Sequence, residues 1–158
     1  MKRSLCVAAL LLVAALAAPP TAGALIQLNR GIAGVRLNNT KAEVRAALGK
    51  PRRVIHGMND FGAFTRFRYT GRIDVIFQSG NRGTSVTTRG LGDRTARGVG
   101  VGSRERTVKR RTPGVKCETF IGGIRSCHTG TFGAGTRVTD FRIRNNRVTR
   151  VTVARVID

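Results

Sequence analysis

The sequence predicts an α+β fold in which two tandem helix-plus-β-meander units form one antiparallel sheet with short helices on one face. The first observation behind this prediction is a repeat, because the stretch 34–51, GVRLNNTKAEVRAALGKP, returns in degraded form at 98–115 as GVGVGSRERTVKRRTPGV. The second observation is that apolar and polar residues alternate in the segments after each copy. These features delimit half-repeats at about 31–91 and 98–158 within a single domain, 25–158.

The N-terminus predicts a secretory signal peptide over residues 1–24. Lys2 and Arg3 precede an apolar run, Pro19-Pro20 end that run, and Ala22-Gly23-Ala24 is the small-residue pattern typical of cleavage after Ala24. The run is shorter than the roughly 20 apolar residues that span a bilayer, which disfavours a transmembrane anchor. No segment of the mature chain is apolar enough to span a membrane, so we expect a secreted or extracytoplasmic protein.

Two short helices are expected, one in each copy of the repeat. In the first copy Thr40-x-x-Glu43 is a capping box, which satisfies two backbone amides at the helix N-terminus, and Gly49-x-Pro51 ends the helix. In the second copy Ser103 is expected to cap a helix whose surface is heavily basic.

Strands are expected where apolar residues alternate with polar ones. In the first unit they lie at 64–70, 72–78 and 84–88, after an extended lead-in at 25–32. In the second unit they lie at 115–120, 126–128, 137–144 and 147–156. Residues 52–60 are expected to be irregular, and the Gly-rich segment 89–97 to be a surface connection.

Cys117 and Cys127 are the cysteines that remain once Cys6 leaves with the signal peptide. An even pair in an exported chain predicts a disulfide, which would close a loop of about ten residues worth roughly 3 kcal/mol. A metal site or a catalytic thiol would need further partners, and His128 is the only histidine nearby. The disulfide is therefore the favoured interpretation.

The mature chain is strongly basic. Without the leader, 134 residues remain, with 27 basic side chains against 8 acidic ones and a net charge of +19. Such an excess favours anionic partners, namely nucleic acid, acidic cell-wall polymers, anionic lipid or acidic proteins. In the full sequence Arg outnumbers Lys by 24 to 5, and Ala, Gly and Val are abundant, as a GC-rich genome also produces without selection for binding. Both interpretations of the arginine content stay open at this point.

Basic side chains are expected on the open face of the sheet and on the second helix. The candidate anion- or partner-binding residues are Arg66, Arg68, Arg142, Arg144, Arg150, Lys109, Arg110 and Arg111. Four aromatic side chains are expected on the opposite, core face: Phe67, Tyr69, Phe77 and Phe141. Because single-strand binders stack bases on exposed aromatics, we expect non-specific affinity for polyanions and no sequence-specific recognition of nucleic acid.

The sequence offers no catalytic set, so an enzyme is not expected. It has no G-x-S-x-G elbow and no H-E-x-x-H motif. His56 and Asp60 alone make an incomplete metal site, and the predicted disulfide removes the thiolate that His128 would need. Gly98-x-Gly100-x-Gly102 lacks the third glycine of a dinucleotide fingerprint, because Ser103 takes its place. No catalytic residue, metal or cofactor is therefore predicted.

The two copies of the repeat carry a resemblance to known families. The residues concerned are Gly34-Val35, Leu37, Thr40, Val44, Leu48-Gly49 and Pro51, echoed by Gly98, Val101, Ser103, Val108 and Pro113-Gly114. This pattern, followed by a strand meander, resembles the BamE/SmpA-type domain, and its tandem form with a short disulfide loop looks like the beta-lactamase inhibitor protein architecture. The resemblance implies a fold used for protein–protein contact.

Two departures limit what the resemblance implies. BamE-type proteins carry a lipid-modified Cys after the signal, and none follows Ala24 here. The inhibitor uses an aromatic-rich concave surface, whereas this chain has no Trp and one Tyr, Tyr69, which argues against a tight inhibitor.

Three functions follow from these observations. The first is a secreted, non-enzymatic binding or interaction protein of the cell envelope or extracellular space. The alternative is a basic protein that binds a polyanion, such as a cell-wall polymer, anionic lipid or non-specific nucleic acid. An enzyme of unknown class is the third, because one fold can host unrelated sites.

Overall fold

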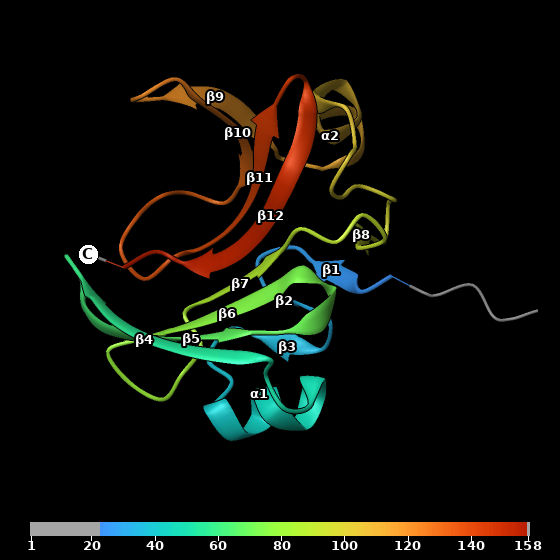
Figure 1. Ribbon diagram of the computed structural model, residues 1–158. Coiled ribbons are helices and arrows are strands. Elements are labelled where there is room, and N and C mark those ends of the chain that lie inside the picture. Colours follow the sequence, from blue (N-terminus) through green and yellow to red (C-terminus); the bar gives the residue numbers. More distant parts are fainter. Residues whose placement is uncertain (1–22, 158) are drawn as a thin grey trace, which may run out of the picture.

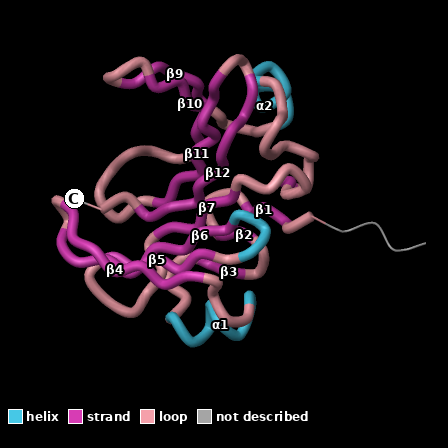
Figure 2. Tube along the Cα trace, in the orientation of Figure 1, coloured by secondary structure: helices cyan, strands magenta, loops and turns pink. Residues whose placement is uncertain are grey.

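The computed structural model of the chain describes residues 23–157, which form two β-sheets and two short α-helices (Figures 1 and 2). The smaller sheet has the strand order β3-β2-β1-β8 and contains β1 (Leu25–Gln27), β2 (Gly31–Ile32), β3 (Val35–Arg36) and β8 (Arg94–Thr95). The larger sheet has eight strands in the order β4-β5-β6-β7-β12-β11-β10-β9. These strands are β4 (Arg53–Asn59), β5 (Gly62–Arg68), β6 (Ile73–Gln78), β7 (Ser85–Thr88), β9 (Lys116–Phe120), β10 (Ile124–Thr129), β11 (Arg137–Arg144) and β12 (Arg147–Arg155).

The predicted α+β class is wrong, because the chain is β-rich and has two sheets. The helices α1 (Lys41–Leu48) and α2 (Glu105–Arg111) are short, with eight and seven residues, and a 3-10 turn lies at Thr70–Arg72. The chain does not divide into two independent helix-plus-meander units, since β8, from the middle of the chain, pairs in parallel with β1 at the N-terminal end of the described chain.

Two features of the sequence explain this error. The strands of the smaller sheet have only two or three residues, which is too short for a period of two to show. The segment 52–60, expected to be irregular, contains β4, an edge strand whose residues are mostly exposed on both sides. Such a strand need not alternate between apolar and polar residues.

The larger sheet is antiparallel throughout, and its two halves meet where β7 pairs with β12. Figure 1 shows β4–β7 below and β9–β12 above, with a strong twist between them. Val86 lies opposite both Val75 and Val153, so one apolar row crosses the junction. Phe67, on β5, and Val151, on β12, are also fully buried on this face.

Helix α1 forms where local signals predict it. Thr40 Oγ1 accepts a hydrogen bond from the Glu43 amide (3.2 Å), and the Glu43 carboxylate accepts one from the Thr40 amide (2.6 Å). Val44 is buried, and the Arg45 guanidinium lies 4.7 Å from the centroid of the Phe67 ring. These contacts fix the helix against the core face of the larger sheet.

Helix α2 begins differently from the prediction. Its N-cap is Arg104, which makes no side-chain cap, whereas the Ser103 hydroxyl accepts a hydrogen bond from the Gly100 amide (3.1 Å). The buried side chain of the helix is Val108.

None of the helices in the described part of the chain is long and apolar enough to cross a membrane. The predicted signal peptide, 1–24, lies almost wholly outside the described residues, so its cleavage after Ala24 stays a prediction.

Candidate functional site

The open face of the larger sheet carries a concentration of arginines. In an antiparallel pair, residues directly opposite each other point to the same side, and successive residues point to opposite sides. Phe67 and Phe141 are buried on the core face, so their neighbours Arg66, Arg68 and Arg142 emerge on the other face. Arg150 lies directly opposite Arg142 and joins them.

Four arginines of this face surround one shallow hollow of about 330 Å³. We call it the arginine basin, and its lining residues are Arg89, Arg142, Arg144, Thr149 and Arg150. A β-bulge shapes it, because the register shifts after Arg142 and leaves Thr149 as the extra residue of β12. The basin therefore combines two facing strands, a bulge and the residue that follows β7.

Arg150 is the most constrained member of the basin. Its Nε atom is buried and has no hydrogen-bond partner among the described residues. Burial, then the neighbouring charges of Arg89 and Arg142, lower the pKa of the Arg150 guanidinium, while Asp140 opposes this shift. A like-charged pair directly across two strands destabilises a sheet. The fold thus holds the Arg150 guanidinium among like charges and leaves its buried Nε atom without a hydrogen-bond partner.

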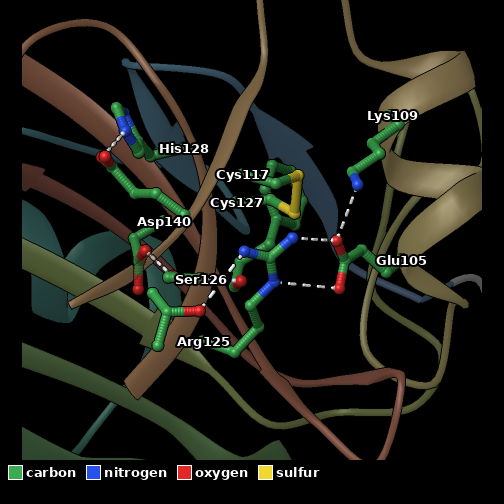
Figure 3. The surroundings of a disulfide bond; sticks show 11 residues. Glu105, Lys109, Cys117, Arg125, Ser126, Cys127, His128 and Asp140 are labelled. Carbon is green, nitrogen blue, oxygen red and sulfur yellow. Dashed lines mark hydrogen bonds and ion pairs between the residues drawn. A yellow bond between two sulfur atoms is a disulfide. The ribbon is translucent and has the colours of Figure 1, made fainter. Parts of the chain in front are cut away.

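Two carboxyl groups lie near the basin: Asp74, which pairs with Arg89 (3.1 Å), and Asp140, on β11. The Asp140 Oδ1 atom accepts a hydrogen bond from the Ser126 hydroxyl, and Figure 3 shows the two side chains together. Burial raises the pKa of the Asp140 carboxyl, and the Ser126 hydrogen bond and the charges of Arg150 and Arg142 oppose this rise. Two carboxyls cannot balance four guanidinium groups, so the basin keeps an excess of positive charge.

A second hollow, of about 400 Å³, adjoins the basin through Arg89. It is lined by Arg52, Arg53, Arg68, Tyr69, Arg72, Asp74 and Arg89. Asp74 forms an ion pair with Arg68 (Nε–Oδ1 3.5 Å) and accepts a hydrogen bond from Arg89 (3.1 Å), and it is the one acidic residue of this hollow. Arg53 lies directly opposite Arg68, a second like-charged pair across neighbouring strands. We call the two hollows together the arginine face.

The structure separates Arg66 from this group. Arg66 lines a different hollow on the same side of the sheet, of about 310 Å³, with apolar neighbours that include Phe61, Phe64 and Ile76. Its guanidinium lies 5.6 Å from the centroid of the Phe64 ring, and its Nε atom is buried without a partner among the described residues.

The basic residues of α2 do not line the arginine face. Lys109 pairs with Glu105 at 2.9 Å, and Arg110 is exposed. Arg111 lines another hollow, of about 400 Å³, beside Leu25, Leu28 and other residues near the smaller sheet. The sequence candidates thus fall into three separate places.

Cys117 and Cys127 form the predicted disulfide, and they lie directly opposite each other on β9 and β10 (Figure 3). Glu105, on α2, lies beside the bond and pairs with Arg125 (2.5 Å) and Lys109 (2.9 Å). Hydrogen bonds from these two cations lower the pKa of the Glu105 carboxyl to about 2.

This cluster is poorly suited to metal binding or nucleophilic chemistry. The Glu105 carboxylate and both cysteine sulfurs lie within 4.8 Å of one another. However, the sulfurs are bonded to each other, and a thiolate is the form that binds metals or attacks. The cations already paired with Glu105 would also repel an ion.

The two histidines lie in different environments. His128 is buried, with Nε2 2.7 Å from the Glu118 carboxylate and Nδ1 3.2 Å from the Gly130 carbonyl. His56 contacts the Thr65 hydroxyl at 3.3 Å, with no carboxylate partner among the described residues. The pair His56 and Asp60 considered as metal ligands therefore belongs to no cluster of three ligands in residues 23–157.

Sequence reasoning missed three features of the arginine face. Arg89 was placed in a surface connection, yet it joins the two hollows. Arg53 was placed in an irregular segment, yet it lies on β4. The sequence predicts that β11 and β12 form a hairpin with Arg142 and Arg150 on one face, but no sequence signal reveals the bulge at Thr149.

Comparison with known proteins gives structural matches only. No family model matches the chain, and no curated protein matches it. A DUF4309 family protein from Bacillus subtilis has a TM-score of 0.50 at 19% identity, and the match covers 77% of this chain and 82% of that one. An extracellular protein containing a SCP domain, from Bacillus anthracis, has a TM-score of 0.52 at 8% identity, covering 75% of this chain.

A cysteine-rich secretory protein from Staphylococcus aureus also matches, with a TM-score of 0.47 at 10% identity over 75% of this chain. The matches span only 44% and 43% of the Bacillus anthracis and Staphylococcus aureus chains. None of the three is described as BamE-like or as a beta-lactamase inhibitor, so that resemblance stays a prediction. At these identities the similarity concerns the fold alone.

Proposed function

We propose that this chain is an extracytoplasmic, non-enzymatic binding protein that holds an anionic polymer against the arginine face. The observation that carries the proposal is Arg150, whose buried Nε atom lacks a partner while like charges flank its guanidinium. A donor left in this state costs stability, and an anion in the basin would offset that cost by pairing with the same guanidinium and neutralising the charges around it.

The distribution of the arginines supports binding over genomic bias. A bias in codon usage adds arginines without regard to their position in the fold. The larger sheet holds four directly opposed arginine pairs, including Arg137 with Arg155 and Arg144 with Arg147. The other two, Arg142 with Arg150 and Arg53 with Arg68, lie in adjoining hollows on the same side of the sheet. Each pair works against the sheet, so their coincidence in adjoining hollows favours a functional origin.

The extracytoplasmic location has two supports besides the signal-peptide prediction. The Cys117–Cys127 disulfide is typical of proteins in oxidising compartments. The similar structure from Bacillus anthracis is described as an extracellular protein.

A polymer fits this surface better than a folded protein partner. Protein interfaces rely on large aromatic or aliphatic anchors, and none of the exposed large apolar side chains lines the arginine face. Its one aromatic, Tyr69, is only 9% exposed.

The test is elution from an anionic matrix, with two variants that change the net charge equally. Arg142→Glu with Arg144→Glu reverses two charges in the basin, and Arg106→Glu with Arg110→Glu reverses two exposed charges on α2. The basin variant should elute at clearly lower salt than the α2 variant. Equal elution of the two variants would contradict the proposal, because net charge alone would then explain retention.

A further inference from the structure

We propose that the arginine basin recognises phosphoryl groups, and that the anionic polymer is phosphate-linked rather than carboxylate-based. This inference rests on the proposed function and names the chemistry of its ligand.

The donors of the basin suit a tetrahedral oxyanion. Each guanidinium presents up to five N–H donors in a planar fork that pairs two oxygens at once. Arg142 and Arg150 face the basin from neighbouring strands, and Arg89 enters from the end of β7. A single guanidinium fork can pair both oxygens of a planar carboxylate. Donors that approach from three directions instead match the tetrahedral arrangement of the oxygens of a phosphate.

The bulge also brings Thr149 to the same hollow, where its hydroxyl donates to the Arg142 carbonyl (3.3 Å). Because the register shifts after Arg142, Thr149 has no partner residue in the ladder, and it lines the basin beside Arg144. A hydroxyl and four guanidinium groups then surround a space of about 330 Å³. This volume lies at the lower end of the range for small-ligand pockets, so it admits a phosphoryl group together with part of the chain that carries it.

Charge also favours a phosphoryl ligand. Asp74 already pairs with Arg68 and Arg89, and the Asp140 carboxyl accepts from Ser126. Arg142, Arg144 and Arg150 make no ion pair with a described carboxylate. The basin therefore retains charge that a ligand of high charge density can neutralise.

The shape of the arginine face favours a linear polymer over a membrane surface or a stacked single strand. The second hollow continues from the basin through Arg89, so a chain with repeated phosphates can engage both hollows. Neither hollow is lined by an exposed large apolar side chain that could enter a lipid layer. Neither offers an exposed aromatic ring on which a base could stack.

The experiment compares the affinity of the full mature chain for sodium polyphosphate and for poly-L-glutamate of matched charge, by calorimetry at one fixed salt concentration. We expect polyphosphate to bind about tenfold more tightly, which corresponds to about 1.4 kcal/mol. Arg150→Lys keeps the charge and removes the fork, so it should weaken polyphosphate binding much more than poly-L-glutamate binding and bring the ratio of the two affinities close to one. Arg106→Lys, on the exposed side of α2, is the matched control.

The outcomes separate this inference from the proposed function. Equal binding of both polymers, with no effect of Arg150→Lys, would overturn the phosphoryl site and leave polyanion binding intact. Binding of neither polymer would overturn both. If the chain cosediments with phosphatidylglycerol vesicles with an affinity equal to that for polyphosphate, the result would overturn the claim that a polymer is the source of the phosphoryl group. Loss of the preference in Arg150→Lys and not in Arg106→Lys, with a melting temperature no lower than that of the wild type, supports the site.

Discussion

Replacing Arg150 with Gln should stabilise the fold while it weakens anion binding. The change removes one member of a like-charged cross-strand pair, worth roughly 0.2–1 kcal/mol. It also removes a buried N–H donor without a partner, which lowers the free energy of unfolding of the wild type by about 1–3 kcal/mol. The shorter Gln stem loses apolar contact worth about 1 kcal/mol. The net gain is about 1 kcal/mol, or about 3 °C in Tm for a chain of this size.

The assay is thermal unfolding of the wild type, Arg150→Gln and the exposed-site control Arg106→Gln, in low salt without multivalent anions. The control should shift Tm by no more than about 1 °C. In about 1 M salt the advantage of Arg150→Gln should shrink, because the repulsion from Arg89 and Arg142 is screened. A Tm for Arg150→Gln several degrees below the wild type would refute the reasoning, since Arg150 would then be held by favourable contacts.

Three further changes test the parts of the fold that hold the sheet and its helices. Glu105→Gln should remove an acid-sensitive contribution to stability. Because the pKa of Glu105 is lowered from 4.5 to about 2, its stabilising effect is complete above about pH 4.5 and is lost as the pH falls toward about 2. Between these pH values the Tm of the wild type should therefore fall by more than the Tm of the variant. Thr40→Ala should lower the free energy of unfolding by about 1 kcal/mol, and Thr40→Ser should restore most of it, as measured by urea unfolding. The double change Cys117→Ala with Cys127→Ala should cost roughly 3 kcal/mol, and the wild type treated with reductant should lose a similar amount; a variant as stable as the oxidised wild type would contradict the entropic account.

Local signals predicted individual elements well. The capping box and the Gly-x-Pro stop located α1, because capping involves residues three or four apart. The alternation around Phe67 and Phe141 correctly assigned their buried and open faces, since the side-chain period of a strand depends only on the strand itself.

Pairing between distant segments was not predictable in the same way. Nothing in Leu25–Gln27 indicates that it will pair in parallel with Arg94–Thr95, and strands of this length carry too few residues for a pattern. The candidate site shows the same limit. Arg68, Arg142 and Arg150 were identified, yet their meeting with Arg89 depends on the β7–β12 junction and on the bulge.

Both outer strands of the larger sheet, β4 and β9, leave one side of their backbone unpaired. Val54 and Met58, on β4, are also exposed, which makes this edge a template for pairing with another copy of the chain. Mutual repulsion between strongly basic molecules, with a net charge of +21 for the full sequence, opposes that contact. A polyanion that neutralises this charge removes the colloidal protection, so occupancy of the arginine face and self-association of the protein become linked. We therefore expect turbidity to peak where the charges of protein and polymer balance, and to clear when polymer is in excess.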